Sequence, residues 1–153
     1  MRLDELLLTV HLLAVATWIG TALAVQVLGA RIGPETEDVV VDRFAVDAEA
    51  VGKALFAPAA ALVLVTGLAL VIREDLSWTE PWILLGIAAF VVTGGIGGAF
   101  LIPEGRRIAA LAREPGHDPA EVRVRSRRRL RMARVDLTLL VLTVGVMVSR
   151  VGA

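Results

Sequence analysis

Four long apolar runs constrain this chain more than any other feature. They cover residues 6–28, 54–72, 82–102 and 137–148. A helix needs roughly 20 residues to cross a hydrocarbon core about 30 Å thick. The first three runs contain no charged residue and reach that length, and the fourth reaches it if its helix begins near Leu130. The sequence therefore predicts an all-α polytopic membrane protein, a four-helix bundle.

Composition agrees with a membrane location. Hydrophobic residues make up 56% of the chain, and the mean hydropathy of +0.72 leaves little polar surface for a water-soluble globule. Nearly all the charge lies between the runs, where a membrane protein carries it. The chain has no cysteine, which excludes disulfides, thiolate catalysis and cysteine-ligated metal sites.

The basic residues predict an orientation. We place the spans of a single domain at about 5–30, 53–72, 81–102 and 130–149. Arg2, Arg73 and Arg150 then face one side, and the other thirteen basic residues face the other. Short loops rich in arginine and lysine stay in the cytoplasm. We therefore expect a multi-pass protein of the bacterial cell membrane with both termini outside the cytoplasm.

The segments between the spans carry helical patterns of their own. Pro34 suits the first turn of a helix whose apolar positions Val40, Phe44, Val51 and Leu55 lead directly into the second span. The third span is expected to continue past Pro103. Residues 114–117 read as a turn, and residues 118–121 as a capped helix start. These patterns predict two cytoplasmic helical hairpin extensions, with no internal repeat.

His11 is the one histidine inside a predicted span, and Trp18 lies on the same helix face seven residues later. A polar residue at that depth is costly and usually faces the bundle interior. It either ligates haem or a metal such as copper, accepts a proton, or forms a hydrogen bond to a neighbouring helix. Met147 is a conceivable second ligand. His117 lies in a cytoplasmic turn, so two histidines of one chain cannot hold one haem.

Asp136 is expected about one turn inside the cytoplasmic end of the fourth span. No basic residue lies three or four positions away on its own helix. An unpaired carboxylate at that depth is expensive, so we expect a cation from another helix, with Lys53 first and Arg31 second. The pair would be a structural clamp; the alternative is a proton or ion relay.

Gly94 and Gly98 form a G-x-x-x-G motif, which permits close helix packing within the chain or in a dimer. The arginines from Arg123 to Arg134 form the densest charge run. Anionic lipid headgroups suit such a run. No aromatic residue interleaves it, so we expect no nucleic-acid partner.

Several segments together resemble the bacterial predicted integral membrane proteins of domain-of-unknown-function family 2269. They are residues 6–20 (LLLTVHLLAVATWIG), 64–68 (LVTGL), 78–86 (WTEPWILLG) and 134–137 (RVDL). The resemblance spans nearly the whole chain and implies a four-helix membrane protein.

The histidine, tryptophan and glycine of the first helix also resemble, more distantly, copper-resistance D proteins and membrane protoporphyrinogen oxidases. That resemblance implies haem b bound by a first-helix histidine, which His11 matches. The oxidases carry a lysine four residues after a tryptophan that opens a later helix; here Gly86 follows Trp82 at that distance. The departure argues against oxidase activity.

Two functions stay open at this point. The first is a non-enzymatic bundle that forms an oligomer or serves as an accessory subunit, with the lipid bilayer as its surroundings and no cofactor. The second is a haem b- or copper-binding membrane protein that uses His11.

Overall fold

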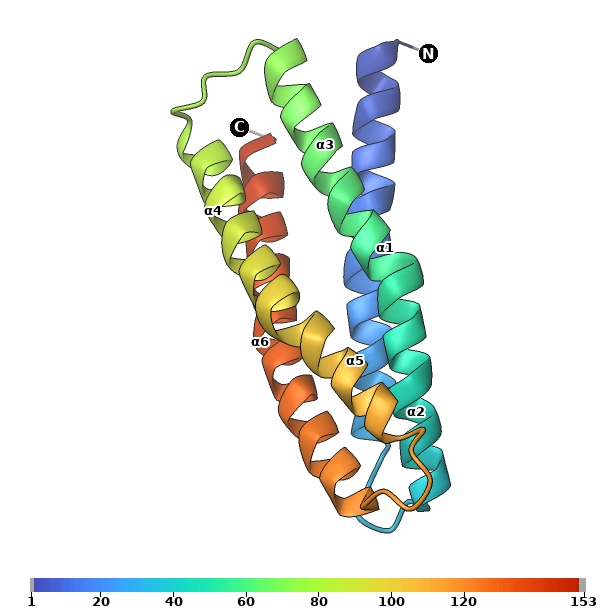
Figure 1. Cartoon of the computed structure of the whole chain (residues 1–153). Coiled ribbons are helices and arrows are strands. Elements are labelled where there is room, and N and C mark those ends of the chain that lie inside the picture. The colour runs from blue at the N-terminus through green and yellow to red at the C-terminus, as the bar shows by residue number, and fades with distance from the viewer. Residues whose placement is uncertain (1, 152–153) are drawn as a thin grey trace.

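The computed structural model describes the backbone of residues 2–151 and the side chains of residues 2–149 (Figure 1). The side chain of Arg150, which enters the charge asymmetry, lies outside the described part. The α-helices are α1 (Leu3–Ala30), α2 (Asp38–Val51), α3 (Ala57–Arg73), α4 (Pro81–Ile96), α5 (Ile102–Leu111) and α6 (Pro119–Val151). Two π-helical turns, η1 (Gly52–Phe56) and η2 (Gly97–Leu101), join α2 to α3 and α4 to α5. The all-α prediction is confirmed.

The described chain forms four long helical rods. They are α1, the continuous rod α2–η1–α3, the continuous rod α4–η2–α5, and α6, and each is long and apolar enough to cross a membrane. The loop between α3 and α4 lies at the same end of the bundle as the start of α1 and the end of α6 (Figure 1). The α1–α2 and α5–α6 connections lie at the opposite end, where α2, α5 and the first half of α6 extend the bundle.

The two π-helical turns share a sequence pattern, Gly-x-Ala-x-x-x-Pro, at residues 52–58 and 97–103. In each turn, the N–H group one residue before the proline donates to the carbonyl of the first glycine, five residues back. A proline ring inside a helix clashes with the carbonyl four residues earlier, and a wider turn is one way a helix adapts. The prolines thus account for the matching π-helical turns in the two rods. The shared seven-residue pattern is a short local similarity in a chain for which we predicted no internal repeat.

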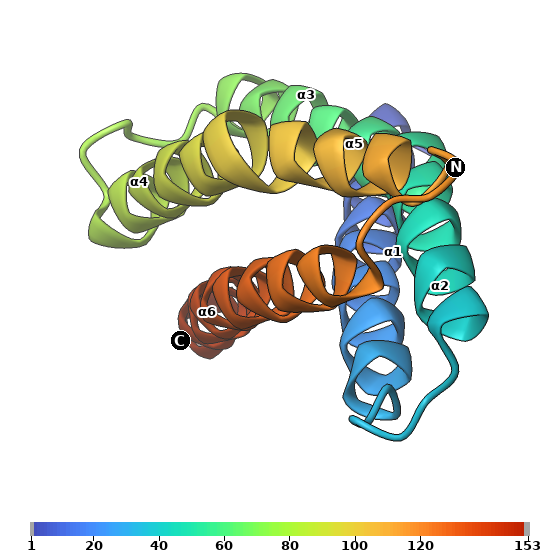
Figure 2. The same cartoon turned by 60° about the horizontal axis from the view of Figure 1, so that its bottom comes forward.

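The rods associate as two pairs. The most extensive contacts join α1 to α3 and α4 to α6, and contact between α3 and α4 is minor at most. The pairs diverge toward the end that carries the α3–α4 loop and converge where α2 and α5 pack together (Figures 1 and 2). The bundle is therefore closed at one end and splayed at the other.

Two small apolar clusters hold the pairs together. Trp18, Ala59 and Leu140 form the first cluster, at mid-height. Val41, Ala45, Ile108 and Val122 form the second, within the extension. Most other large apolar side chains face outward, as expected for a protein whose surroundings are lipid rather than water.

Candidate functional site

His11 lies on α1 and makes its polar contact with α3. Its Nδ1 lies 2.9 Å from the hydroxyl oxygen of Thr66. That hydroxyl donates its single hydrogen to the carbonyl of Leu62, so it accepts a hydrogen bond from the Nδ1–H of His11. With its proton on Nδ1, the neutral imidazole carries its lone pair on Nε2.

Gly67 makes this approach possible. A Cβ atom at Gly67 would lie only 3.2 Å from Cε1 of His11. Thr66 and Gly67, consecutive on α3, thus fix both the hydrogen bond and the position of the ring.

Trp18 lies two turns farther along α1, at the centre of the bundle. Its side chain is 4% exposed and meets the rings of Phe56 and Phe90 edge-on, at centroid distances of 5.6 and 5.9 Å. Its indole Nε1 is buried with no hydrogen-bond partner among the described residues. Trp18 therefore packs α1 against both rods that contain a π-helical turn.

Met147 lies in the other helix pair. A Cβ atom at Gly86 of α4 would meet the terminal methyl of Met147, so this side chain packs directly on the α4 backbone. The contacts of His11 are with α3, and this contact of Met147 is with α4. The structure thus brings His11 to Thr66 and Gly67, and Met147 to Gly86.

A second site is a pocket beside the two π-helical turns that combines charged residues with apolar walls. We call this cavity of about 120 Å³ the kink pocket; it lies between α1, the α2–η1–α3 rod, the η2 and α5 segments, and α6. Five charged residues line it: Glu49, Lys53, Arg106, Arg129 and Asp136. Its remaining walls are mostly small or apolar, and they include both π-turn glycines, Gly52 and Gly97.

Asp136 is the most deeply buried charged residue of the kink pocket. Its side chain is 1% exposed, and its Oδ1 has no hydrogen-bond partner among the described residues. Lys53 lines the same pocket, whereas Arg31 caps the C-terminal end of α1. Within the described side chains, no ion pair joins Asp136 to either cation, so the predicted clamp stays a prediction.

Arg129 is the cation of the kink pocket that makes a hydrogen bond to the chain. Its Nε donates to the carbonyl of Leu101, 3.0 Å away. A Cβ atom at Gly105 would lie 3.0 Å from that Nε, so Gly105 leaves room for the guanidinium. The hydrogen bonds of the described residues leave both terminal nitrogens of Arg129 free.

Gly94 and Gly98 lie on an exposed face of the α4–η2 rod. A Cβ atom at Gly98 would have no neighbour within 4 Å, and one at Gly94 would meet only Phe90 of its own helix. In the described part of the chain, no other helix uses these glycines for close packing. The close helix contacts instead involve Gly29, Gly67, Gly86 and Gly105.

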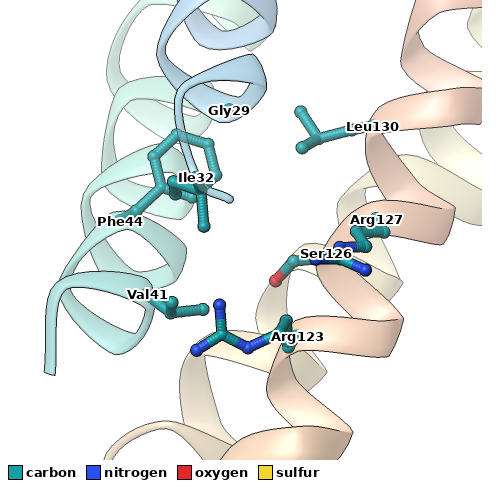
Figure 3. Close-up of a pocket in the computed structure, with 8 residues that line it drawn as sticks. All are labelled: Gly29, Ile32, Val41, Phe44, Arg123, Ser126, Arg127 and Leu130. Atoms are coloured by element: carbon teal, nitrogen blue, oxygen red, sulfur yellow. The ribbon is translucent and has the colours of Figure 1, made fainter. Parts of the chain in front are cut away.

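Much of the arginine run is occupied within the chain. Arg123 donates to the carbonyls of Gly33 and Thr36 at 2.9 Å, and to the carboxylate of Asp38 at 2.8 Å. Figure 3 shows its guanidinium pointing from α6 toward Val41 of α2. These bonds tie α6 to the α1–α2 loop.

Two further arginines of the run have partners of their own. Arg125 pairs with Glu121 of its own helix and with the buried Glu104 of α5. Arg128 lies over the ring of Phe100, 5.4 Å from its centroid. Arg127, Arg131 and Arg134 stay exposed and are the members free to meet lipid headgroups.

Our sequence reasoning missed two polar residues that the structure makes important. Gln26 of α1 is buried, and its side-chain nitrogen donates to the carbonyl of Leu130 on α6, 2.8 Å away. Thr66 holds His11. Both are polar residues inside otherwise apolar runs, and that signal could have found them.

In a comparison with protein-family models, residues 5–151 match the family described as "Predicted integral membrane protein (DUF2269)". The chain belongs to this family. It is therefore an integral membrane protein, as the apolar runs predict, and the family resemblance stated from the sequence is confirmed. No curated protein and no solved structure matches the chain. The distant resemblance to copper-resistance D proteins stays a resemblance.

Proposed function

We propose that this protein is a non-enzymatic membrane bundle that self-associates through the face of Gly94 and Gly98. The observation that carries the proposal is the exposure of both glycines on a rod that no other helix of the described chain covers there. Val91, one turn earlier, is 66% exposed and extends the same stripe. A stripe of this kind lets a second helix approach closely, which is how helices gain packing energy in lipid.

A second copy of the chain is the occupant we favour. In a two-fold dimer, the same patch on each copy faces its own equivalent, so one exposed stripe is sufficient. The splayed arrangement of the helix pairs also leaves α4 accessible from its outer side (Figure 2).

The mass of the protein in detergent, measured by light scattering after size exclusion, tests the proposal. We expect a dimer for the unaltered chain and a monomer for Gly98→Leu, because the leucine separates the two backbones. Gly145→Leu on α6 is the matched control, since Gly145 is also exposed with no neighbour within 4 Å of an added Cβ. A monomeric unaltered protein, or dimers for both variants, would refute self-association through this face. Copurification of a different membrane protein, lost in Gly98→Leu, would replace the second copy by that partner.

The second candidate function is haem b or copper binding by His11. Its support is the tautomer of the imidazole: Thr66 accepts from Nδ1–H, which places the lone pair on Nε2, as in metal-ligating histidines whose other ring nitrogen donates a hydrogen bond. The donor set fits a single protein ligand, and Met147 would have to come from the other helix pair. An absorbance spectrum with metal analysis of the purified protein is the test. A Soret band or stoichiometric copper that His11→Ala abolishes would establish this function, and absence of both would remove it.

A further inference from the structure

The kink pocket is built where both π-containing rods bend. Gly52 and Lys53 of η1 face it from one rod, and Gly97 and Leu101 of η2 from the other. Lys53 and Ile102 are also the residues at which two of the predicted spans begin and end. With these predicted span limits, the pocket lies at the level of the membrane where lipid headgroups meet acyl chains.

The kink pocket offers hydrogen-bond donors and acceptors that the chain itself does not use. The terminal nitrogens of Arg129 are free, and Lys53 and Arg106 add two further cations. Glu49 supplies carboxylate oxygens, and Asp136 a buried oxygen without a partner. A ligand that satisfies both sets carries an anionic group and a separate hydrogen-bond donor.

We propose that the kink pocket binds the headgroup of an aminophospholipid, a phosphate linked to a primary amine. The phosphate meets Arg129 and the neighbouring cations, and the ammonium donates to Asp136. Charge-assisted hydrogen bonds of this kind are the strong ones. This inference goes beyond the proposed self-association and does not depend on it.

The walls of the pocket favour a lipid over a free phosphate. Val25, Phe56, Leu101 and Ile102 give it an apolar lining on the side of the spans. An acyl chain gains by covering such a surface, whereas a soluble phosphate does not. A cavity of about 120 Å³ exceeds the roughly 10–15 Å³ that one water requires, so it accommodates a group larger than a single water.

The amine distinguishes this ligand from phosphatidylcholine. The trimethylammonium of phosphatidylcholine has no N–H, so it leaves Asp136 without a donor. A hydrogen bond to a charged group contributes enough to give about a tenfold preference. Phosphatidylethanolamine should therefore be retained about tenfold better than phosphatidylcholine with the same acyl chains.

Native mass spectrometry tests this on the full chain, purified in detergent with equal amounts of phosphatidylethanolamine, phosphatidylcholine and phosphatidylglycerol. Asp136→Leu, which leaves no hydrogen-bond acceptor at this position, should bring the preference for ethanolamine over choline close to one. Arg129→Gln should weaken the retention of all three lipids together. Arg127→Gln is the matched control, because Arg127 belongs to the same run but is exposed and does not line this pocket.

A further variant separates lipid binding from folding. Ala133→Leu fills the kink pocket without removing a charge, so it should reduce lipid retention while helical content and thermal unfolding are kept. Excess glycerophosphoethanolamine, the headgroup without acyl chains, should not displace the lipid. Equal retention of ethanolamine and choline lipids by the unaltered protein would overturn the proposal. So would unchanged retention in Ala133→Leu, or displacement by the free headgroup, which would indicate a soluble phosphate ligand.

Discussion

Gly29 gives the sharpest test of how the extended end of the bundle is packed. It lies on α1 where α2 and α6 come together, and Figure 3 shows Leu130 and Phe44 on either side of it. A Cβ atom at Gly29 would lie 2.6 and 2.8 Å from the two methyl groups of Leu130, and 3.2 Å from the ring of Phe44. The adjoining cavity has a volume of about 10 Å³, roughly one water, so it cannot take the three carbons of a valine.

We therefore expect Gly29→Val to destabilise the protein by about 2 kcal/mol. Overpacking of a closed site costs about 1–3 kcal/mol, and the better helix propensity of valine over glycine returns only about 0.3 kcal/mol. For a chain of this size, 2 kcal/mol corresponds to a fall in Tm of about 4–8 °C. Thermal unfolding in detergent, followed by circular dichroism, measures it.

Gly20→Val is the matched control for this prediction. Gly20 lies on the same helix, is exposed, and has no neighbour within 4 Å of an added Cβ. Its variant should stay within about 0.5 kcal/mol of the unaltered protein. Equal Tm values for the Gly29 and Gly20 variants would refute the claim that α1, α2 and α6 are closely packed at Gly29.

Three further predictions follow from the extension. Arg123→Gln should lower stability by about 2–3 kcal/mol, because two hydrogen bonds to the α1–α2 loop and one to Asp38 of α2 are lost; thermal unfolding checks it against Arg127→Gln. The pKa of His117 is raised, because its ring donates to the carbonyl of Glu114 and faces the Asp42 carboxylate at 3.1 Å. Protonated His117 therefore stabilises the folded state fully at pH values below the unfolded pKa of about 6.5, and this stabilisation is lost as pH rises through the raised pKa of the folded state. In thermal unfolding at several pH values, His117→Gln should remove this pH dependence. Reporter fusions within residues 114–118 should report the cytoplasm and C-terminal fusions the opposite side; reporters on one side would contradict the orientation.

Local sequence signals predicted the last helix well and the second helix less well. The capped start at Asp118 is confirmed, since its carboxylate accepts from the N–H of Ala120 and α6 begins at Pro119. Pro34 was expected in the first turn of a helix, but α2 begins at Asp38. The intervening turn is held by Arg123, ninety positions away from Gly33. A local pattern carries no information about such a distant donor.

The prediction of which face of α2 is buried was also wrong, by one position. The expected apolar stripe begins at Val40, yet Val40 is half exposed and the buried residues are Val41, Ala45 and Ala48. The two small alanines let α2 approach its neighbours closely, so packing, rather than the largest apolar side chains, decides the face. In a membrane protein large apolar residues are at no disadvantage facing outward, which weakens hydrophobic periodicity as a guide.

The kink pocket shows why a site of this type escapes prediction from a pattern. Proline causes the bends in both rods, and this much is readable at Pro58 and Pro103. That the two bends lie at the same level, and that Arg129 and Asp136 of α6 reach them, depends on how the rods pair in space. The sequence identified Asp136 as unusual because it lies inside the fourth span. The polar residues around its carboxylate, however, come from the three other helical rods, and their positions depend on the fold. A buried carboxylate with an unused oxygen costs stability, and the ammonium of the proposed lipid headgroup would supply the missing hydrogen-bond donor.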